Sequence, residues 1–436
     1  MTRQEHLSFR FSSSKGRRIK AAFDGGRISS DGGVLLVREA DRRLDLTRSL
    51  SRLVRDTRRA GSIEHSAESM IRQRVYGLCA DYEDLVDFDE LRADPLWQCA
   101  CGREEALAGK STLSRFEARA DRRLAFEANA LLVESFIDSF DEAPEELILD
   151  FDATDDPVHG HQEGRFFHGY YGHYCFLPLY VFCGDRLLTA YLRPSDRDAA
   201  LHSAAILKLL VKRLRRQWPQ VRIVFRGDSG FCRDRTLAWC DRNGVDYVVG
   251  LARNEVLLRE IAPLMEKARE EHEKTGEKQR LFGGYIYGAK TWTLKRHVIA
   301  KAEHSNKGSN PRFVVTSLEG DEQDIYEKIY CARGEMENRI KEQMTLFSDR
   351  TSAAHWWANQ WRLILSAYAY TLWECVRRIG LQGTQFVRAQ CSTLRLKFLK
   401  IGALVEKGSR VLRLRLPSAF PHKELFIQAV ARLRPT

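Results

Sequence analysis

Four aspartates follow a short apolar run in the segment LILDFDATDDPVHG, residues 147–160. They are Asp150, Asp152, Asp155 and Asp156. Carboxylates this close together repel one another, so a compensating cation, either a metal ion or an arginine, is expected nearby. If the apolar run is a strand, its side chains alternate between two faces, and Asp150 and Asp152 share one face with Ile148. The segment therefore predicts a charged site at the end of a strand, whereas Asp155 and Asp156, beside Pro157, are better explained by turn or capping roles.

A second acid, Asp228, ends another apolar run in IVFRGDSGF. Ligands of α/β sheets gather at the carboxyl ends of strands, so this aspartate is well placed for chemistry. It is equally well placed to cap a turn or the next helix, and the segment alone leaves both interpretations open.

A third candidate is the helical segment YCARGEMENRIKE, residues 330–342. Tyr330, Arg333, Glu337 and Lys341 are spaced by three, four and four residues, so they share one helix face. A ladder of salt bridges explains the charges but not the tyrosine. Two aspartates on neighbouring strands and a glutamate on a helix would supply oxygen ligands for Mg²⁺. Two such ions about 4 Å apart can activate a water or a 3′-hydroxyl and stabilise the leaving oxygen of a phosphodiester.

The elements that must position these residues form an α/β pattern that begins near residue 146. The chain before it is expected to be mostly helical, with Ser30 and Asp31 capping one helix, another helix over 66–79, and Ser114 and Glu117 forming a capping box. From Glu146 the pattern predicts a strand, a hairpin around Gly184-Asp185, and then helix, strand, helix and strand. This order fits a ribonuclease H-like mixed sheet, although other α/β folds share it.

The remaining segments predict a helix over 254–272, three strands over 283–318, and an aromatic helix over 355–379. That helix carries Trp356, Trp357, Trp361 and Trp373 and is better explained as core or dimer interface than as a base-stacking surface. Near the end, TLRLKFLK and VLRLRL alternate leucine with basic residues, which predicts a β-ribbon with one basic face.

Charge separates the ends of the chain from its middle. The formal net charge is +11; residues 1–60 carry 15 Lys/Arg against 7 Asp/Glu, and residues 377–436 carry 13 against 2. The middle must then carry −8. Basic ends favour a polyanionic partner, most simply nucleic acid. No run of eighteen apolar residues and no secretory signal core is found, and the cysteines are scattered, so we expect a soluble cytoplasmic protein with no membrane partner.

Three other motifs are set aside. GKST at 109–112 lacks the earlier glycine of a phosphate-binding loop, because Glu104 occupies that position. Cys99 and Cys101 have no second pair with which to form a zinc site. Four histidines lie among aromatic residues, a mixture that fits a loop stacking on nucleic acid better than a metal site; they are His159, His161, His168 and His173.

The three motifs in order resemble the DDE transposases of bacterial insertion sequences, and the similarity is greatest to the insertion sequence 1380 group. Asp152-Ala153-Thr154 matches the first Asp-x-Thr, Gly227-Asp228 the second acid, and 330–337 the signature around the glutamate. DFDATDDPVHGHQEG, PLYVFCGDRL and RGEMENRIKE carry the likeness to the group. The resemblance implies a ribonuclease H-like catalytic core, a β-rich insertion before the glutamate, and cut-and-paste transposition by a magnesium-dependent endonuclease and strand transferase.

The resemblance also implies roles for individual residues. Asp152, Asp228 and Glu337 become the catalytic acids that bind two Mg²⁺ ions, for which Mn²⁺ can substitute. Tyr330 and Arg333 would contact DNA near the scissile phosphate. The family has a lysine seven residues after the glutamate, where this chain has Met344, and Lys341 on the Glu337 face is expected to replace it. Asp150 remains a rival to Asp152 as first ligand.

We therefore expect a transposase that binds double-stranded DNA at the terminal inverted repeats of its element, as a homodimer in the DNA complex. Two alternatives stay open: a catalytically silent DNA-binding regulator with the same fold, and a sugar hydrolase using Asp152 and Asp228 as acid and base. The expected organisation is a helical DNA-binding or dimerisation region at 1–145, core segments at 146–253 and 321–376, a β-rich insertion at 254–320, and a basic C-terminal region at 377–436.

Overall fold

The computed structural model describes residues 8–435. Residues 1–7, which open the segment examined above for a secretory signal, lie outside the described part. The chain folds into two compact units. One unit combines residues 1–119 with 368–436, and the other comprises residues 120–367. Both ends of the chain therefore belong to one unit, and all the candidate acids belong to the other.

A mixed sheet forms the centre of the unit of residues 120–367. Its order is β12-β13-β15-β11-β10-β4-β8-β9, with β14 paired to β13. The strands are β4 (Glu146–Ala153), β8 (Leu179–Cys183), β9 (Arg186–Tyr191), β10 (Arg222–Gly227), β11 (Asp246–Leu251), β12 (Gln279–Tyr287), β13 (Arg296–Ser305), β14 (Gly308–Ser309) and β15 (Arg312–Thr316). The predicted mixed α/β fold is confirmed. The three strands expected at 283–318 are also found, and they continue this sheet because β15 pairs with β11.

The central three strands run in the same direction. β10 pairs in parallel with β4 on one side and β11 on the other, and β8 is antiparallel to β4. Gly227 of β10 is the partner of both Phe151 and Val249. The next residues, Asp152, Asp228 and Gly250, therefore lie at one edge of the sheet, where parallel strands end together.

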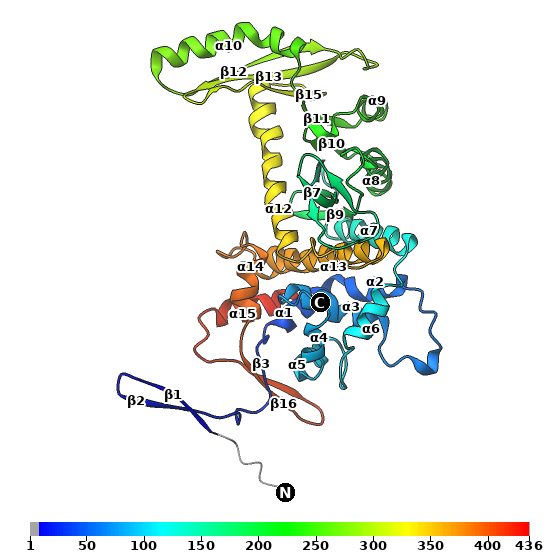
Figure 1. The fold of residues 1–436 in the computed structure, drawn as a ribbon, viewed down its shortest axis with the longest axis vertical. Coiled ribbons are helices and arrows are strands. Elements are labelled where there is room, and N and C mark those ends of the chain that lie inside the picture. The colour runs from blue at the N-terminus through cyan, green and yellow to red at the C-terminus, as the bar shows by residue number, and fades with distance from the viewer. Residues whose placement is uncertain (1–7, 436) are drawn as a thin grey trace. The chain divides into compact units, whose positions relative to one another are not determined.

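Apolar alternation along β4 decides which face of the sheet each acid occupies. Leu147, Leu149 and Phe151 are buried in the larger core, together with residues of α8 and α9. The other face packs on Ile325 and Tyr326. Figure 1 accordingly shows α8 and α9 on one side of the sheet and α12 on the other. Asp150 and Asp152 thus point toward the side covered by the segment that leads into α12.

The helices of this unit are α7 (Arg122–Ile137), α8 (Ser203–Gln217), α9 (Asp234–Arg242), α10 (Glu255–Thr275), α11 (Glu322–Asp324) and α12 (Gly334–Met344), and α13 (Trp356–Cys375) begins in it. Short turns η2 (Ser229–Phe231), η3 (Ile325–Tyr330) and η4 (Cys331–Arg333) complete them. A separate small sheet contains β5 (Asp156–Pro157), β6 (Phe166–His168) and β7 (His173–Phe176). The predicted start of α10 is confirmed, since the Asn254 side chain accepts hydrogen bonds from Val256 N and Leu257 N. Trp361 and Trp373 of α13 are buried, as expected of core residues.

Helices from both ends of the chain build the other unit. They are α1 (Val34–Leu44), α2 (Leu46–Leu53), η1 (Ala60–Ser62), α3 (Ala67–Cys79), α4 (Asp87–Leu91), α5 (Pro95–Ala100), α6 (Lys110–Glu117), η5 (Val376–Gly380), α14 (Cys391–Leu394), η6 (Arg395–Leu399) and α15 (Lys423–Leu433). Its strands are β1 (Phe9–Ser14), β2 (Arg17–Ala21), β3 (Ile28–Ser29), β16 (Ala403–Lys407) and β17 (Leu412–Arg415). The Arg395 guanidinium, which donates to the carbonyl oxygen of Cys79, ties the two parts of this unit together.

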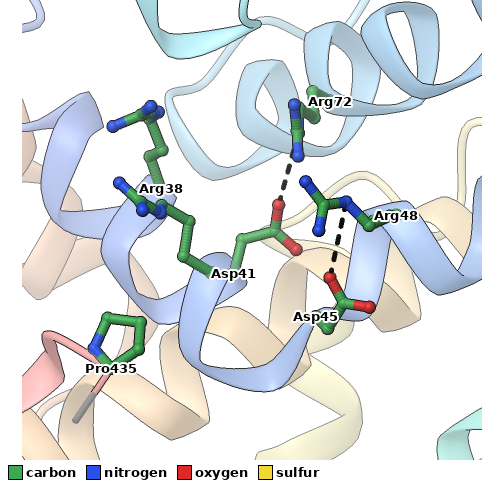
Figure 2. Close-up of a pocket in the computed structure, with 7 residues that line it drawn as sticks. Arg38, Asp41, Asp45, Arg48, Arg72 and Pro435 are labelled. Carbon is green, nitrogen blue, oxygen red and sulfur yellow. Dashed lines mark ion pairs between the residues drawn. The ribbon is translucent and has the colours of Figure 1, made fainter.

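A polar pocket of about 340 Å³ lies in the same unit (Figure 2). It is lined by Arg38, Asp41, Arg42, Asp45, Arg48, Arg72 and Pro435. The buried Asp41 carboxylate accepts hydrogen bonds from Thr47 N at 2.8 Å and from the Tyr76 hydroxyl. Arg72 lies 3.7 Å from Asp41, and Arg48 lies 3.7 Å from Asp45. The pocket is therefore a network of ion pairs that connects α1 to α2 and α3.

Two predicted helix starts are wrong. α1 begins at Val34 with Gly33 as its N-cap. Asp31 is instead buried, and its carboxylate accepts hydrogen bonds from the Tyr82 hydroxyl and Trp97 Nε1. Ser114 and Glu117 lie inside α6, and buried Glu117 pairs with Arg74 at 2.8 Å. In both cases a tertiary partner claims a carboxylate that local spacing assigned to a cap.

Two predictions about strands also need correction. TLRLKFLK is helical, because Leu394, Phe398 and Leu399 are buried while Leu396 is 67% exposed, which is a helical rather than an alternating pattern. The C-terminal ribbon is instead formed by β16 and β17. The predicted hairpin strand at 174–183 is split at Leu177-Pro178 into β7 and β8, which belong to different sheets. The ribbon of β1 and β2 was not predicted at all.

Within the described part of the chain, no helix is long and apolar enough to cross a membrane. All ten cysteines are free thiols.

Candidate active site

The end of β4 carries Asp152 into a largely buried position. Its side chain is 9% exposed, and Oδ1 accepts a hydrogen bond from Ala153 N at 2.8 Å. The apolar residues on either side of it lock the strand into the core, so the carboxylate cannot move to solvent. The position is thus rigid, as a ligand or reacting group requires.

Asp228 follows β10 with an extended backbone and begins the turn η2. Its Oδ1 accepts a hydrogen bond from Gly230 N at 2.8 Å, so the capping role considered above is present. Among the described residues, no hydrogen bond reaches Oδ2. One oxygen thus positions the side chain, and the other remains open to a ligand.

The helical segment after β15 brings the third acid to the sheet edge. Arg333 Nη1 lies 3.5 Å from Asp152 Oδ2, and Arg333 Nη2 lies 3.4 Å from Glu337 Oε1. The Glu337 side chain is 53% exposed, and Arg333 only 21%. The arginine therefore joins the acid of the strand to the acid of the helix. Among the described residues Lys341 forms no ion pair, so the predicted salt-bridge ladder ends at Glu337.

Electrostatics confirm that the three acids share one environment. Burial raises the pKa of Asp152 to about 6, Arg333 opposes that rise, and the Asp228 and Glu337 carboxylates add to it. Like charges that raise one another's pKa attract a cation. The site thus contains the negative potential that the sequence predicted, held in check by one arginine.

Tyr330 reaches the same edge from the helical segment. Burial raises the pKa of its hydroxyl, and the Asp228 carboxylate raises it further. A methyl group on Gly250 would lie 2.7 Å from the Tyr330 hydroxyl oxygen and 2.8 Å from Ser229 N. Only a glycine therefore lets β11 approach the tyrosine and the backbone after Asp228. Sequence analysis did not single out Gly250; a glycine within the valine-rich strand DYVVGL was the available signal.

Asp150, the rival to Asp152, is already paired. Its carboxylate accepts two hydrogen bonds from Arg226, which lies directly opposite on β10, and the Nη2–Oδ2 distance is 2.7 Å. Both side chains are almost fully buried, and Arg226 also donates to the carbonyl oxygen of Ile329. Arg226 thus links both strands to the segment before Tyr330. Sequence analysis missed this arginine, because only the strand register shows that it faces Asp150.

The remaining acids and the histidines have other partners. Asp155 Oδ2 lies 2.9 Å from His173 Nε2, and buried Asp156 accepts a hydrogen bond from Thr351 Oγ1 at 2.8 Å. His161 Nδ1 lies 2.9 Å from Arg165 Nη2. Neither aspartate caps a described helix, so their structural role is one of tertiary contact rather than capping.

The donor atoms at the site suit a hard divalent cation, although the described residues contain no preformed group of three acids, histidines or cysteines that could hold one. Asp152, Asp228 and Glu337 offer carboxylate oxygens, the ligands that Mg²⁺ and Mn²⁺ prefer. Arg333 supplies the positive charge near two of them. The residues fit a metal provided that Arg333 yields its place to it.

Fold, acids and charge together define a protein that acts on phosphodiesters, and comparison with known families gives its class. The family model described as "Transposase DDE domain group 1" matches residues 11–436, and the chain belongs to this family of DDE transposases. No curated protein matches the chain. Among solved structures, the chain is similar to one described as "Cryo-EM structure of piggyBac transposase synaptic complex with hairpin DNA (SNHP)", at 12% identity. That match covers 85% of this chain and 80% of the other, with a TM-score of 0.42.

Proposed function

We propose that this DDE transposase binds the terminal inverted repeats of its element and catalyses metal-dependent DNA cleavage and strand transfer, in cut-and-paste transposition. The observation that carries the proposal is the arrangement around Arg333, which contacts Asp152 and Glu337 while both Asp228 and Glu337 influence the pKa of Asp152. Acids from two adjacent strand ends and a helix thereby share one site. A sugar hydrolase would need only two of them.

The strand order supports the finer assignment of the core. β4, β8 and β9 are antiparallel neighbours, and β10 and β11 add to the other side of β4 in parallel. We propose that these five strands form a ribonuclease H-like core, in which the catalytic acids stand at the ends of β4 and β10. The quoted motifs favour membership of the insertion sequence 1380 group.

In this proposal Asp152, Asp228 and Glu337 hold two Mg²⁺ ions, for which Mn²⁺ can substitute. When bound, such ions activate a water or 3′-hydroxyl and stabilise the leaving oxygen. Arg333 exchanges its carboxylate partners for a phosphate, because a guanidinium binds either group through paired hydrogen bonds. Burial of Asp152 and Tyr330 keeps bulk water from the reacting phosphate and strengthens these interactions. Lys341, which has no ion-pair partner among the described residues, contacts the DNA backbone further along the helix.

The basic ends of the chain would bind the DNA duplex, and a homodimer would pair the two ends of the element. Both expectations rest on charge and on the family. They place residues of 1–145 and 377–436 on DNA or at a dimer interface.

The direct test is a cleavage assay on a plasmid carrying the DNA that flanks this gene, with Mg²⁺ or EDTA. It compares the natural protein with Glu337→Gln and with Glu335→Gln as a matched control. Glu335 lies two residues away, so it points to a different side of α12. We expect defined cuts that need Mg²⁺ and Glu337 but not Glu335. Specific DNA binding without cutting by the natural protein would instead support the silent regulator, and neither binding nor cutting would reject both.

A further inference from the structure

The ribbon formed by β1 and β2 is isolated in the described part of the chain. Its strands pair only with each other, with Arg10 opposite Lys20 and Phe11 opposite Ile19. Figure 1 shows it as a separate two-stranded ribbon before β3. Nearly every residue in it is exposed. A lone hairpin of this kind is marginally stable in water, so a partner is expected to hold it.

The two faces of the ribbon differ in chemistry. Alternation places Arg10, Lys20 and Arg18 on one face. Phe9, Phe11 and Ile19 occupy the other face, where they are 40%, 60% and 40% exposed. The ribbon is thus basic on one side and apolar on the other.

The basic face lacks any compensating charge in the described structure. Residues 8–21 contain five basic residues and no acid, namely Arg10, Lys15, Arg17, Arg18 and Lys20. None of the five forms an ion pair with a described residue. Like charges directly opposite on paired strands destabilise a ribbon, and Arg10 stands opposite Lys20. An anion bound along this face would remove that repulsion.

We propose that the ribbon of β1 and β2 is a DNA-binding arm, whose basic face lies against the backbone of a groove in duplex DNA. A two-stranded β-ribbon fits the width of the major groove, and its lysines and arginines reach the phosphates on either side. The proposal rests on the proposed function, because it takes DNA as the substrate. It adds a specific arm that neither the motifs nor the family description identifies.

The test measures how tightly the full-length protein binds a duplex of unrelated sequence between 50 and 200 mM KCl, by fluorescence anisotropy. The ribbon variant is Arg10→Gln/Arg18→Gln/Lys20→Gln. The matched control, Arg259→Gln/Lys267→Gln/Lys274→Gln, removes three exposed charges from α10. Each lost phosphate contact lowers the slope of log affinity against log salt by about 0.9. The ribbon variant should therefore lose about 2.7 of slope, so that its affinity deficit differs by about 40-fold between the two salt concentrations.

The control should bind like the natural protein, and all three proteins should unfold at the same temperature, since the ribbon buries little surface. Equal slopes for the ribbon variant and the natural protein would overturn the proposal. So would a loss of self-association in sedimentation with no change in slope, which would assign the ribbon to a second copy of the chain. The outcome is separable from the proposed function. Failure of the natural protein to cut DNA while the slopes still differ would reject the catalysis and keep the arm.

Discussion

Arg333 Nη1 lies 3.5 Å from Asp152 Oδ2, and the same guanidinium lies 3.4 Å from Glu337. It occupies a position beside the carboxylates that a metal ion would share. Arg333→Gln should therefore let Mg²⁺ bind at lower concentration, because a competing positive charge is gone, while DNA cleavage falls about 100-fold, as for loss of one charge-stabilising donor. The Mg²⁺ concentration at the midpoint of the rise in melting temperature measures the first effect, and cleavage under saturating Mg²⁺ the second.

Arg333→Lys serves as the comparison, since it keeps the charge but loses the paired geometry. Unchanged Mg²⁺ affinity in Arg333→Gln would show that the arginine does not compete with the metal. Normal cleavage would remove it from the active site.

Gly250→Ala should impair both folding and cleavage. The added methyl would lie 2.7 Å from the Tyr330 hydroxyl and 2.8 Å from Ser229 N. Overpacking of this kind typically costs about 1–3 kcal/mol in the free energy of unfolding. Urea unfolding and cleavage rates measure the two effects, with Gly402→Ala, where no atom lies within 4 Å, as the control.

A double variant identifies which contact matters. Adding Tyr330→Phe removes the hydroxyl but leaves the backbone contact, so it should restore part of the stability lost in Gly250→Ala. Strictly additive losses in the double variant would mean that Tyr330 and Gly250 do not meet.

The buried pair of Arg226 and Asp150 should be required for folding rather than for metal binding. Arg226→Met leaves the Asp150 charge buried without a partner, and such a loss typically costs about 3–5 kcal/mol. Arg226→Met/Asp150→Asn removes both charges and should recover part of that loss. Urea unfolding of the single and double variants measures the pair.

Asp150→Asn also decides between the two candidate ligands on β4. If Asp152 is the ligand, Mg²⁺ should still raise the melting temperature of Asp150→Asn but not that of Asp152→Asn. The opposite result would exchange their roles.

Asp156 should make stability depend on pH. Burial raises its pKa to about 8, and the Asp349 carboxylate adds to the rise. An unfolded aspartate titrates near pH 3.9, so between about pH 4 and 8 the folded state binds more protons than the unfolded state. The free energy of unfolding should therefore fall as pH rises across this window, by up to about 1.4 kcal/mol per pH unit from this group.

Urea unfolding between pH 5 and 8 measures the effect, with Asp156→Asn for comparison. Asparagine keeps an acceptor for Thr351 Oγ1 but does not titrate. The natural protein should lose more stability than the variant as pH rises, and parallel curves would mean that Asp156 is ionised in the folded protein.

The sequence predicted best where one strand or helix repeats its own period. The alternation of LILDFDA predicted both faces of β4, and the spacing from Tyr330 to Glu337 predicted one helix face. Asn254 and Ser66 were predicted as caps from local chemistry alone, and both are confirmed. Prediction failed where a distant partner decided the outcome, as at Asp31, which binds Tyr82 and Trp97, and at Glu117, which binds Arg74.

By itself, the sequence determined the mixed α/β class, the three acids in order and the basic ends, because periodicity, residue type and net charge are properties of short segments. Tertiary structure alone decided which acid is free and which is paired. Asp150 and Asp152 are two residues apart on one face, yet the register of β10 places Arg226 against the first, and the helical segment places Arg333 against the second. Strand register and helix docking depend on contacts between residues that are distant in sequence, and local pattern does not encode those contacts.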